Sequence, residues 1–365
     1  YKVKEFEEKF ARYTGAVYAH AVTSGTAALK VALAALGVGP GDEVITQGFT
    51  FVATYEAIIE SGAVPVPAEI DSTLNLDPVD FERKITDKTR AVIPVHMLGS
   101  PARIQDIVDI ARARDIKVIE DTAQALGAAV GGKQLGTWGD MGTFSFDYYK
   151  TVTTGEGGMV VTNDRDLYVK ASQYSDHGHD HNPEVHRALE GRSFLGFNYR
   201  MGELQGAIGL AQLGKLDDMI ERQRQNQQLI RETLESLDGI TMRSLPESGR
   251  DSYTHVCFFL ENSDKAVVFH KKLAEKGVPA IYFKNNLWHY LANWEHLIDR
   301  KTAWPGPYPF SGPIYGREIT YSSDMLPVTG SVLERLVVMP ISLQMDEERI
   351  RSIVMELQAA AEEVS

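Results

Sequence analysis

Apolar and polar residues follow two different periods along the first two thirds of the chain. Short runs such as DEVITQG at 42–48 and TRAVIPVHM at 89–97 are rich in β-branched residues and predict strands. Segments such as RIQDIVDIARARD at 103–115 repeat apolar residues every three or four positions, which predicts amphipathic helices. This alternation is typical of an α/β protein with a mainly parallel sheet covered by helices on both faces.

Other segments extend the alternation to about residue 235. SGTAALKVALAAL at 24–36 predicts a helix capped by its serine, and FVATYEAIIESG at 51–62 predicts a helix that ends on a glycine. AVPVPAEI at 63–70 and IKVIEDTA at 116–123 predict two more strands. From Gly202 the helical pattern runs on to residue 237, which predicts one helix long enough to link two domains or to line a subunit interface.

After Gly239 the pattern predicts a smaller α+β unit. THVCFFL at 254–260 predicts a strand, whereas DKAVVFHKKLAEKG at 264–277 and DEERIRSIVMELQAAAEEV at 346–364 predict helices. We therefore expect a large domain over residues 1–235 and a small C-terminal domain over residues 236–365.

Two aromatic stretches lie within the expected small domain. AWPGPYPFSGPIYG at 303–316 is rich in Pro and Gly and predicts an ordered loop or lid. NNLWHYLANWEHL at 285–297 predicts an amphipathic segment in which His289 and Tyr290 are the more exposed pair. Its apolar residues at helical spacing are expected to face the core: Trp288, Leu291, Trp294 and Leu297.

Composition narrows the class of protein. The 365 residues include 37 Lys and Arg against 50 Asp and Glu, a net charge of −13, which argues against nucleic acid as a partner. Cys257 is the only cysteine, so a disulfide framework and a cysteine-based metal site are excluded, and a cytoplasmic location is expected. No apolar run approaches the roughly 18 residues of a membrane span. YKVKEFEEKF at 1–10 predicts an amphipathic helix rather than a signal peptide, and because it lacks Met we expect a preceding segment.

Polar residues that could bind a ligand or take part in catalysis follow several predicted strands and begin several helices. Ser24, Gly25 and Thr26 lie at a helix start, where free N–H groups favour a phosphate, although an ordinary N-cap is by itself the commoner explanation of such a serine. Asp121 and Gln124 follow the strand IKVIE, at the edge where α/β sheets bind ligands, although the acid could also be a helix cap.

Phe51 and Lys150 complete the candidate site. Phe51 precedes a helix and could stack on a flat ring or belong to the core. Lys150 lies between Ser145 and the run GEGG, on a connection between two predicted strands, and a solvated surface lysine is the alternative. A phosphate site, an aromatic plate, a carboxylate and a loop lysine together fit pyridoxal 5′-phosphate, which needs an amine, an acid at its pyridine nitrogen and phosphate anchors.

The chain resembles the DegT/DnrJ/EryC1/StrS sugar aminotransferases, a family of fold-type-I pyridoxal phosphate enzymes. The resemblance rests on SGTAAL, GFTFVAT, EDTAQALGA, SFDYYKTVTTGEGGMVVTND and GFNYRMGELQGAIGLAQLGKLD. It implies Lys150 as the Schiff-base lysine, Asp121 at the pyridine nitrogen and Gln124 near the ring hydroxyl. It also implies Phe51 stacked on the ring. Around the phosphate it implies Ser24, Gly25, Thr26 and Ser145.

The resemblance extends to assembly and reaction type. It implies that Asn198 reaches the phosphate of the neighbouring subunit, so that the active unit is a homodimer. Dehydratases of the family have His where this chain has Lys150, so transamination is favoured. A cofactor-binding sensor without turnover is the alternative from another functional class.

The sugar acceptor depends on two further segments. SDHGHDH at 175–181 and WHYLANWEHL at 288–297 are similar to family members that aminate an 8-oxo derivative of 3-deoxy-octulosonate for lipopolysaccharide, with glutamate as donor. An aminotransferase for a nucleotide-linked 3-keto or 4-keto sugar is the alternative. Candidate substrate contacts are His177, His179, His181, His289 and Tyr290.

The clustered histidines leave three readings open. A substrate or interface cluster, a metal site and plain loop histidines all agree with His177, His179 and His181, and a metal site would require a strand there. We expect no metal. For an acidic acceptor the candidate cations are Arg187, Arg200 and Lys284.

Overall fold

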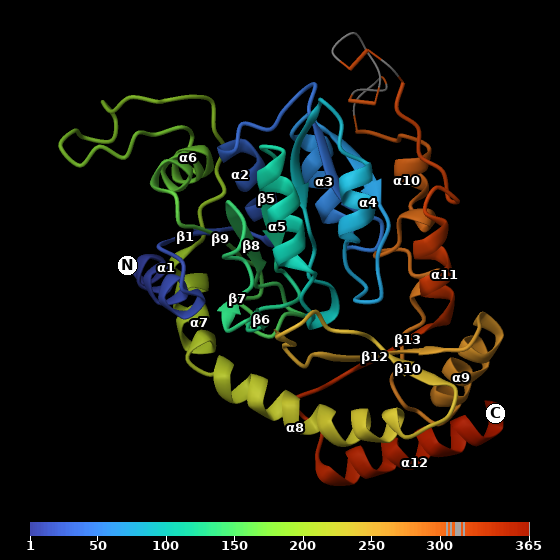
Figure 1. Ribbon diagram of the computed structural model, residues 1–365. Coiled ribbons are helices and arrows are strands. Elements are labelled where there is room, and N and C mark those ends of the chain that lie inside the picture. The colour runs from blue at the N-terminus through green and yellow to red at the C-terminus, as the bar shows by residue number, and fades with distance from the viewer. Residues whose placement is uncertain (304–305, 307–308, 311–314, 317, 365) are drawn as a thin grey trace.

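The computed structural model describes residues 1–303, 306, 309–310, 315–316 and 318–364. The loop expected at 303–316 therefore lies largely outside the described residues. The chain has the mixed α/β architecture expected from its sequence, with a large, mostly parallel sheet (Figure 1). Among the described residues, no helix is both long and apolar enough to cross a membrane.

The main sheet contains seven strands in the part of the chain that the structure describes, in the order β1-β9-β8-β5-β4-β2-β3. Strands β3, β2, β4, β5 and β8 run parallel. At one edge β9 runs antiparallel to β8, and β1 pairs antiparallel with β9 and so has the direction of the parallel strands. Their bounds are β1 Tyr18–Val22, β2 Glu43–Gln47, β3 Val64–Ala68, β4 Thr89–Ile93, β5 Lys117–Asp121, β8 Met141–Ser145 and β9 Gly158–Thr162.

Helices cover both faces of this sheet because its strands are apolar on both sides (Figure 1). In β4, Ala91 and Ile93 face the cluster that contains α2, whereas Val92 between them faces the cluster that contains α5. The helices that accompany the sheet are α1 Lys2–Thr14, α2 Gly25–Ala35, α3 Ala53–Glu60, α4 Pro78–Arg83, α5 Ile104–Ala113, α6 Arg165–Ser175 and α7 Glu203–Leu213, with a 3-10 turn η1 at Met97–Gly99.

The C-terminal part builds a second layer around the antiparallel sheet β10-β12-β13. Helices α8 and α12 lie side by side beneath it in Figure 1, and α9 packs on the same core. The bounds are α8 Leu216–Glu235, β10 Ile240–Met242, β12 His255–Leu260, α9 Ser263–Glu275, η2 Phe283–Asn285, η3 Leu291–Asn293, α10 Glu295–Ile298, α11 Pro327–Arg335, β13 Leu336–Pro340 and α12 Glu347–Val364.

The N-terminal and C-terminal parts are joined by more than one connection. The short strand β11 (Gly249–Arg250) pairs with β6 (Ala129–Val130), which in turn pairs with β7 (Lys133–Gln134). The division into domains at 235/236 remains a prediction, with α8 at the boundary.

Two predicted elements are wrong in detail. The single long helix expected after Gly202 is broken at Gly214 and Lys215 into α7 and α8, because the N–H of Lys215 bonds to the carbonyl of Gln212 at 3.0 Å, three residues back, and Lys215 has a φ of −107°. The segment 285–297, whose apolar residues were expected at helical spacing, contains the last residue of η2, the 3-10 turn η3 and the start of α10.

Candidate active site

The ends of the parallel strands open into a cavity of about 550 Å³. Strands β2, β4, β5 and β8 end near it, and the polar residues that follow them line its wall, as parallel α/β sheets favour. Eight residues predicted from the sequence as cofactor contacts meet there: Ser24, Gly25, Thr26, Phe51, Asp121, Gln124, Ser145 and Lys150.

One end of the cavity is suited to bind an anion. Ser24 caps α2, and its Oγ accepts the N–H of Ala27 at 3.1 Å, so the N-cap reading is correct. The first N–H groups of a helix have no partner within it, and Gly25 and Thr26 line the cavity, so this end of the cavity favours a phosphate. A Cβ added to Gly25 would lie 2.7 Å from the Cβ of Ser145, so only glycine leaves this space open.

Asp121 lies at the end of β5 and is 5% exposed. Its Oδ1 accepts the N–H of Ala123 at 3.1 Å, and its Oδ2 accepts the hydroxyl of Thr54 at 3.0 Å. Burial raises the pKa of Asp121, while these hydrogen bonds and the positive charge of Lys150 oppose the rise. A buried carboxylate in this position is suited to face a cationic ring nitrogen.

Lys150 lies on the loop between β8 and β9, as the sequence predicted. Burial lowers the pKa of its amine, and the carboxylates of Asp147 and Asp121 act in the opposite direction. A partly desolvated amine loses its proton more readily than a surface lysine and is a better nucleophile.

Gln124 is oriented by the turn η1. Its carboxamide oxygen accepts the N–H of Leu98 at 3.0 Å. Because this oxygen is engaged, the amide NH₂ is the part of Gln124 that can donate to a ligand in the cavity.

The C-terminal half of the chain supplies one wall of the cavity. The N–H groups of Thr50 and Val52 donate to the carbonyls of His289 and Trp288, each at 3.0 Å. Phe51 lies against the Trp288 indole, with ring centroids 6.1 Å apart and planes 14° apart. These bonds place Trp288 and His289 beside Phe51 in the cavity wall.

His289 has a defined tautomer. The Oδ1 atom of Asn286 accepts the backbone N–H groups of Trp288 and His289, so this atom must be the amide oxygen. Its contact with His289 Nδ1 at 3.1 Å then requires a proton on Nδ1, which leaves Nε2 as the acceptor of the neutral ring. Burial and the charge of Lys150 lower the pKa of His289 to about 4.

The exposure predicted for this segment is wrong at two positions. Trp288 is 61% exposed, whereas Tyr290 is 2% exposed and does not line the cavity. The cause is strand-like pairing of Tyr290 with Phe49, which turns neighbouring side chains to opposite sides. Leu291, Trp294 and Leu297 are buried as expected.

The clustered histidines lie on an arm, residues 176–200, that projects beyond α6 in Figure 1. They do not line the cavity of this chain. His179 Nδ1 lies 2.6 Å from Glu190 Oε1, and the Nε2 of His181 lies 3.7 Å from Asp176 Oδ2. The segment is a loop with positive φ at His177 and His181, and no metal-binding group of three or more His, Cys, Asp or Glu occurs among the described residues.

The cations proposed for an acidic acceptor are paired with acids. Arg187 and Arg200 both bind the buried carboxylate of Asp176, and together they lower its pKa. Lys284 Nζ lies 2.6 Å from Glu334 Oε1. None of the three lines the cavity. Asn198 is exposed on the arm, outside the cavity.

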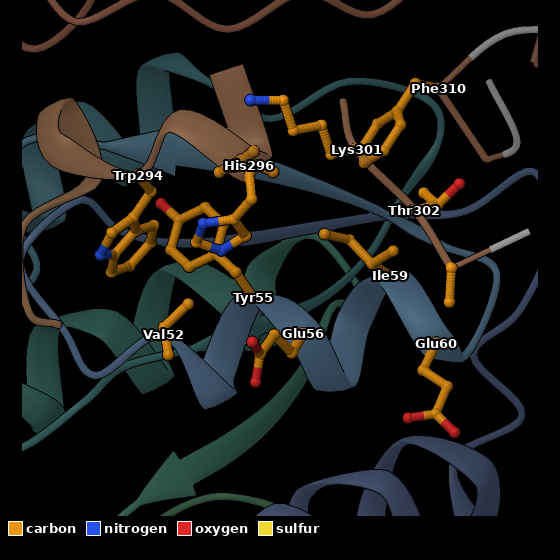
Figure 2. Close-up of a pocket in the computed structure, with 12 residues that line it drawn as sticks. Val52, Tyr55, Glu56, Ile59, Glu60, Trp294, His296, Lys301, Thr302 and Phe310 are labelled. Atoms are coloured by element: carbon orange, nitrogen blue, oxygen red, sulfur yellow. The ribbon is translucent and has the colours of Figure 1, made fainter. Parts of the chain in front are cut away.

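A second cavity of about 430 Å³ lies on another side of α3 (Figure 2). Figure 2 shows Tyr55 and Ile59 of α3 on the same side as Trp294 and His296, and most of the wall is apolar. It contains none of the residues predicted for the site. The cavity with Lys150 is therefore the candidate active site.

Residues beyond the predicted ones also line the Lys150 cavity. Thr54 and Trp288 lie within motifs that the sequence had already marked, but neither carried a chemical signal of its own. The cavity offers an anion site, a buried carboxylate and an amine together, which is the donor set that pyridoxal phosphate requires. The residues present therefore fit this cofactor.

Comparison with known proteins agrees with the geometry. Residues 1–358 match the model of the DegT/DnrJ/EryC1/StrS aminotransferase family. The GDP-perosamine synthase of Escherichia coli O157:H7 is 38% identical over 83% of this chain and 83% of its own length. That of Vibrio cholerae is 36% identical over 83% of this chain and 81% of its own length.

A solved structure shows the same fold. The aminotransferase from Psychrobacter cryohalolentis superposes with a TM-score of 0.85 and 28% identity, covering 100% of this chain and 92% of that one.

Proposed function

Because the chain belongs to the DegT/DnrJ/EryC1/StrS aminotransferase family and is a pyridoxal phosphate-dependent aminotransferase, we propose that it carries an amino group from glutamate to a nucleotide-linked keto sugar. The observation that supports this best is the cavity that joins Lys150, Asp121 and the anion site of α2. When bound, the cofactor supplies an electron sink and carries the amino group between the two substrates.

Each residue of the cavity has a role in this proposal. Lys150 would hold the cofactor through Nζ, and the same amine would take up and return a proton as general base and acid. Asp121 would hold the pyridine nitrogen and stay ionised there, since opposite charges at short range favour the charged form. Gln124 would hold the ring hydroxyl and Phe51 would pack against the ring. The phosphate would be held by Ser24, Gly25, Thr26 and Ser145.

The similar proteins favour one acceptor class over the other. The charges of the cavity do not decide between them, because a nucleotide diphosphate and an octulosonate are both anionic, and Asp121, Asp147 and Glu156 line the wall together with Lys150. An acidic octulosonate aldehyde, which the sequence resemblance implied, is kept as the alternative acceptor. The relatives named GDP-perosamine synthase support a nucleotide-linked sugar instead.

We further propose a cytoplasmic homodimer. The arm carries large apolar side chains in contact with solvent, among them Leu189 at 81% and Leu195 at 93% exposure. Exposed apolar groups of this size favour a protein contact. A second copy of the chain would cover them and bring Asn198 to the phosphate of its neighbour. His177, His179 and His181 would then lie near that neighbour's substrate, while His289 contacts substrate within its own chain.

The first experiment is the absorption spectrum of the holoenzyme with glutamate and without acceptor. Loss of the absorption of bound pyridoxal phosphate in favour of its aminated form supports the donor half-reaction. A spectrum that does not change with glutamate would reject glutamate as donor. The aminated enzyme is then offered a GDP-linked keto sugar and an octulosonate aldehyde, and the acceptor that restores the first spectrum identifies the class.

Lys150→Ala tests the role of the lysine. We expect it to bind cofactor without covalent attachment and to lose the rate of the first half-reaction by at least about 10³-fold, as for removal of a proton-transferring nucleophile. Lys170→Ala, an exposed lysine of α6, is the matched control. An active Lys150→Ala enzyme would contradict the assignment.

A further inference from the structure

Thr54 contacts Asp121 directly inside the protein. Its Oγ1 lies 3.0 Å from Asp121 Oδ2, and the two residues are 1% and 5% exposed. Thr54 belongs to the first turn of α3, so the helix backbone holds its short side chain and hydroxyl in place.

A second threonine lies behind the first. Thr50 Oγ1 is 2.9 Å from Thr54 Oγ1, and Thr50 is fully buried. A hydroxyl has one proton, so when Thr54 donates to an ionised Asp121, Thr50 must donate to Thr54. The reverse order would start from a protonated Asp121 and end at the carbonyl of Phe51, 3.4 Å from Thr50 Oγ1, which is a long hydrogen bond.

The direction of this chain of hydroxyls therefore depends on the charge of Asp121. Both short bonds exist in either order, but donation by the Thr54 hydroxyl and by the N–H of Ala123 stabilises the ionised carboxylate, which opposes the effect of burial on the pKa of Asp121. The carboxylate is also prevented from rotating, because its Oδ1 accepts the N–H of Ala123 and its Oδ2 accepts the hydroxyl of Thr54.

The same turn connects this acid to the rest of the wall. Residues 50 and 52 are bonded to the carbonyls of His289 and Trp288, and Phe51 lies between them. One turn of chain thus carries both the aromatic ring at the cavity and the hydroxyls that reach Asp121.

We propose that Thr54, supported by Thr50, is a positioning residue that keeps Asp121 ionised and aimed at the pyridine nitrogen of the cofactor. The inference rests on the proposed placement of Asp121. Thr54 does not touch the reacting atoms in this account, and it acts only through the carboxylate.

The test compares three variants of the holoenzyme. Thr54→Val keeps the shape and removes the hydroxyl, Thr54→Ser keeps the hydroxyl, and Thr50→Val removes only the outer donor. Thr46→Val is the matched control, because its buried hydroxyl donates to the Ile93 carbonyl at 2.7 Å in β2, away from the cavity.

The readouts are the rate of cofactor release and the pH dependence of the absorption of the bound cofactor. We expect Thr54→Val to release cofactor about tenfold to a hundredfold faster, the effect of losing one hydrogen bond to a charged group. Its spectrum should titrate at a different pH, because Asp121 protonates more easily. Thr54→Ser should stay near wild type, and Thr50→Val should fall between them.

Several outcomes would overturn the inference. Thr54→Val with wild-type release and spectrum would do so, as would Thr54→Ser behaving like Thr54→Val, since the methyl group and not the hydroxyl would then matter. If Thr54→Val does not fold, Thr50→Val behaving like Thr46→Val would also contradict it. Asp121→Asn distinguishes a failure of the Thr54 proposal from a failure of the proposed function. If Asp121→Asn also retains cofactor normally, the proposed placement of Asp121 at the pyridine nitrogen is wrong.

Discussion

Gly25→Ala should damage the anion site more than the fold. The added Cβ would lie 2.7 Å from the Cβ, 3.1 Å from the Oγ and 3.4 Å from the Cα of Ser145. Carbon atoms pack at about 3.5–4.0 Å, so α2 and β8 must separate by roughly 1 Å. Ser145 cannot avoid the contact by changing rotamer, because its Cβ and Cα belong to a strand paired on both sides.

The size of the effect follows from this shift. Overpacking of a filled interior costs about 1–3 kcal/mol of folding free energy. A shift of the helix start also lengthens the hydrogen bonds from its N–H groups to a phosphate, and each such bond to a charged group contributes about 1.5–3 kcal/mol. Cofactor affinity should therefore fall by at least about tenfold, beyond any loss of stability.

Two assays separate these effects. Thermal unfolding of the cofactor-free protein reports the packing cost, and titration with pyridoxal phosphate reports affinity. Gly214→Ala is the matched control, because its Cβ would meet nothing closer than 3.7 Å and its φ of −65° suits alanine. A Gly25→Ala protein that binds cofactor as tightly as wild type would refute the reasoning.

Two further predictions concern charge. Burial raises the pKa of Asp121, so the folded cofactor-free protein binds more protons there than the unfolded chain, and Asp121→Asn should raise its melting temperature at pH 7. A gain that persists below about pH 3, where the acid is protonated in both states, would contradict this explanation. The pKa of His289 is lowered to about 4, so the unfolded chain binds more protons and stability should fall as pH drops from about 6.5 to 4, by at most about 3 kcal/mol. His289→Gln should flatten this dependence in urea unfolding at several pH values, and an unchanged slope would show that His289 is not its cause.

Local sequence signals were sufficient to predict residues that line the Lys150 cavity. A serine before an apolar helix, an acid at a strand end and a lysine between two strands are each positioned by backbone geometry nearby in the chain. Parallel strands bring their ends to one edge, so these residues meet once the sheet forms. The family resemblance gave the same residues.

These local signals did not predict the contacts between segments that are distant in the sequence. The helical period at 285–297 predicted a buried Trp288, but pairing with residues 48–52 exposes it and buries Tyr290. The apolar pattern on both sides of Gly214 likewise predicted one continuous helix, whereas the structure breaks the helix there. Periodicity describes which faces of an element are apolar and not which partner covers them.

The sequence by itself determined the alternation of strands and helices, the residues at their ends and hence the class of chemistry, because these depend on interactions within a few residues. Only the tertiary structure decided that Thr54 bonds to Asp121, that Asn286 fixes the tautomer of His289, and that Arg187 and Arg200 share Asp176. Those contacts join residues of different elements or depend on the path of a loop. Hydrogen bonds act only at short range and in narrow geometry, so they exist only where packing has already placed both partners.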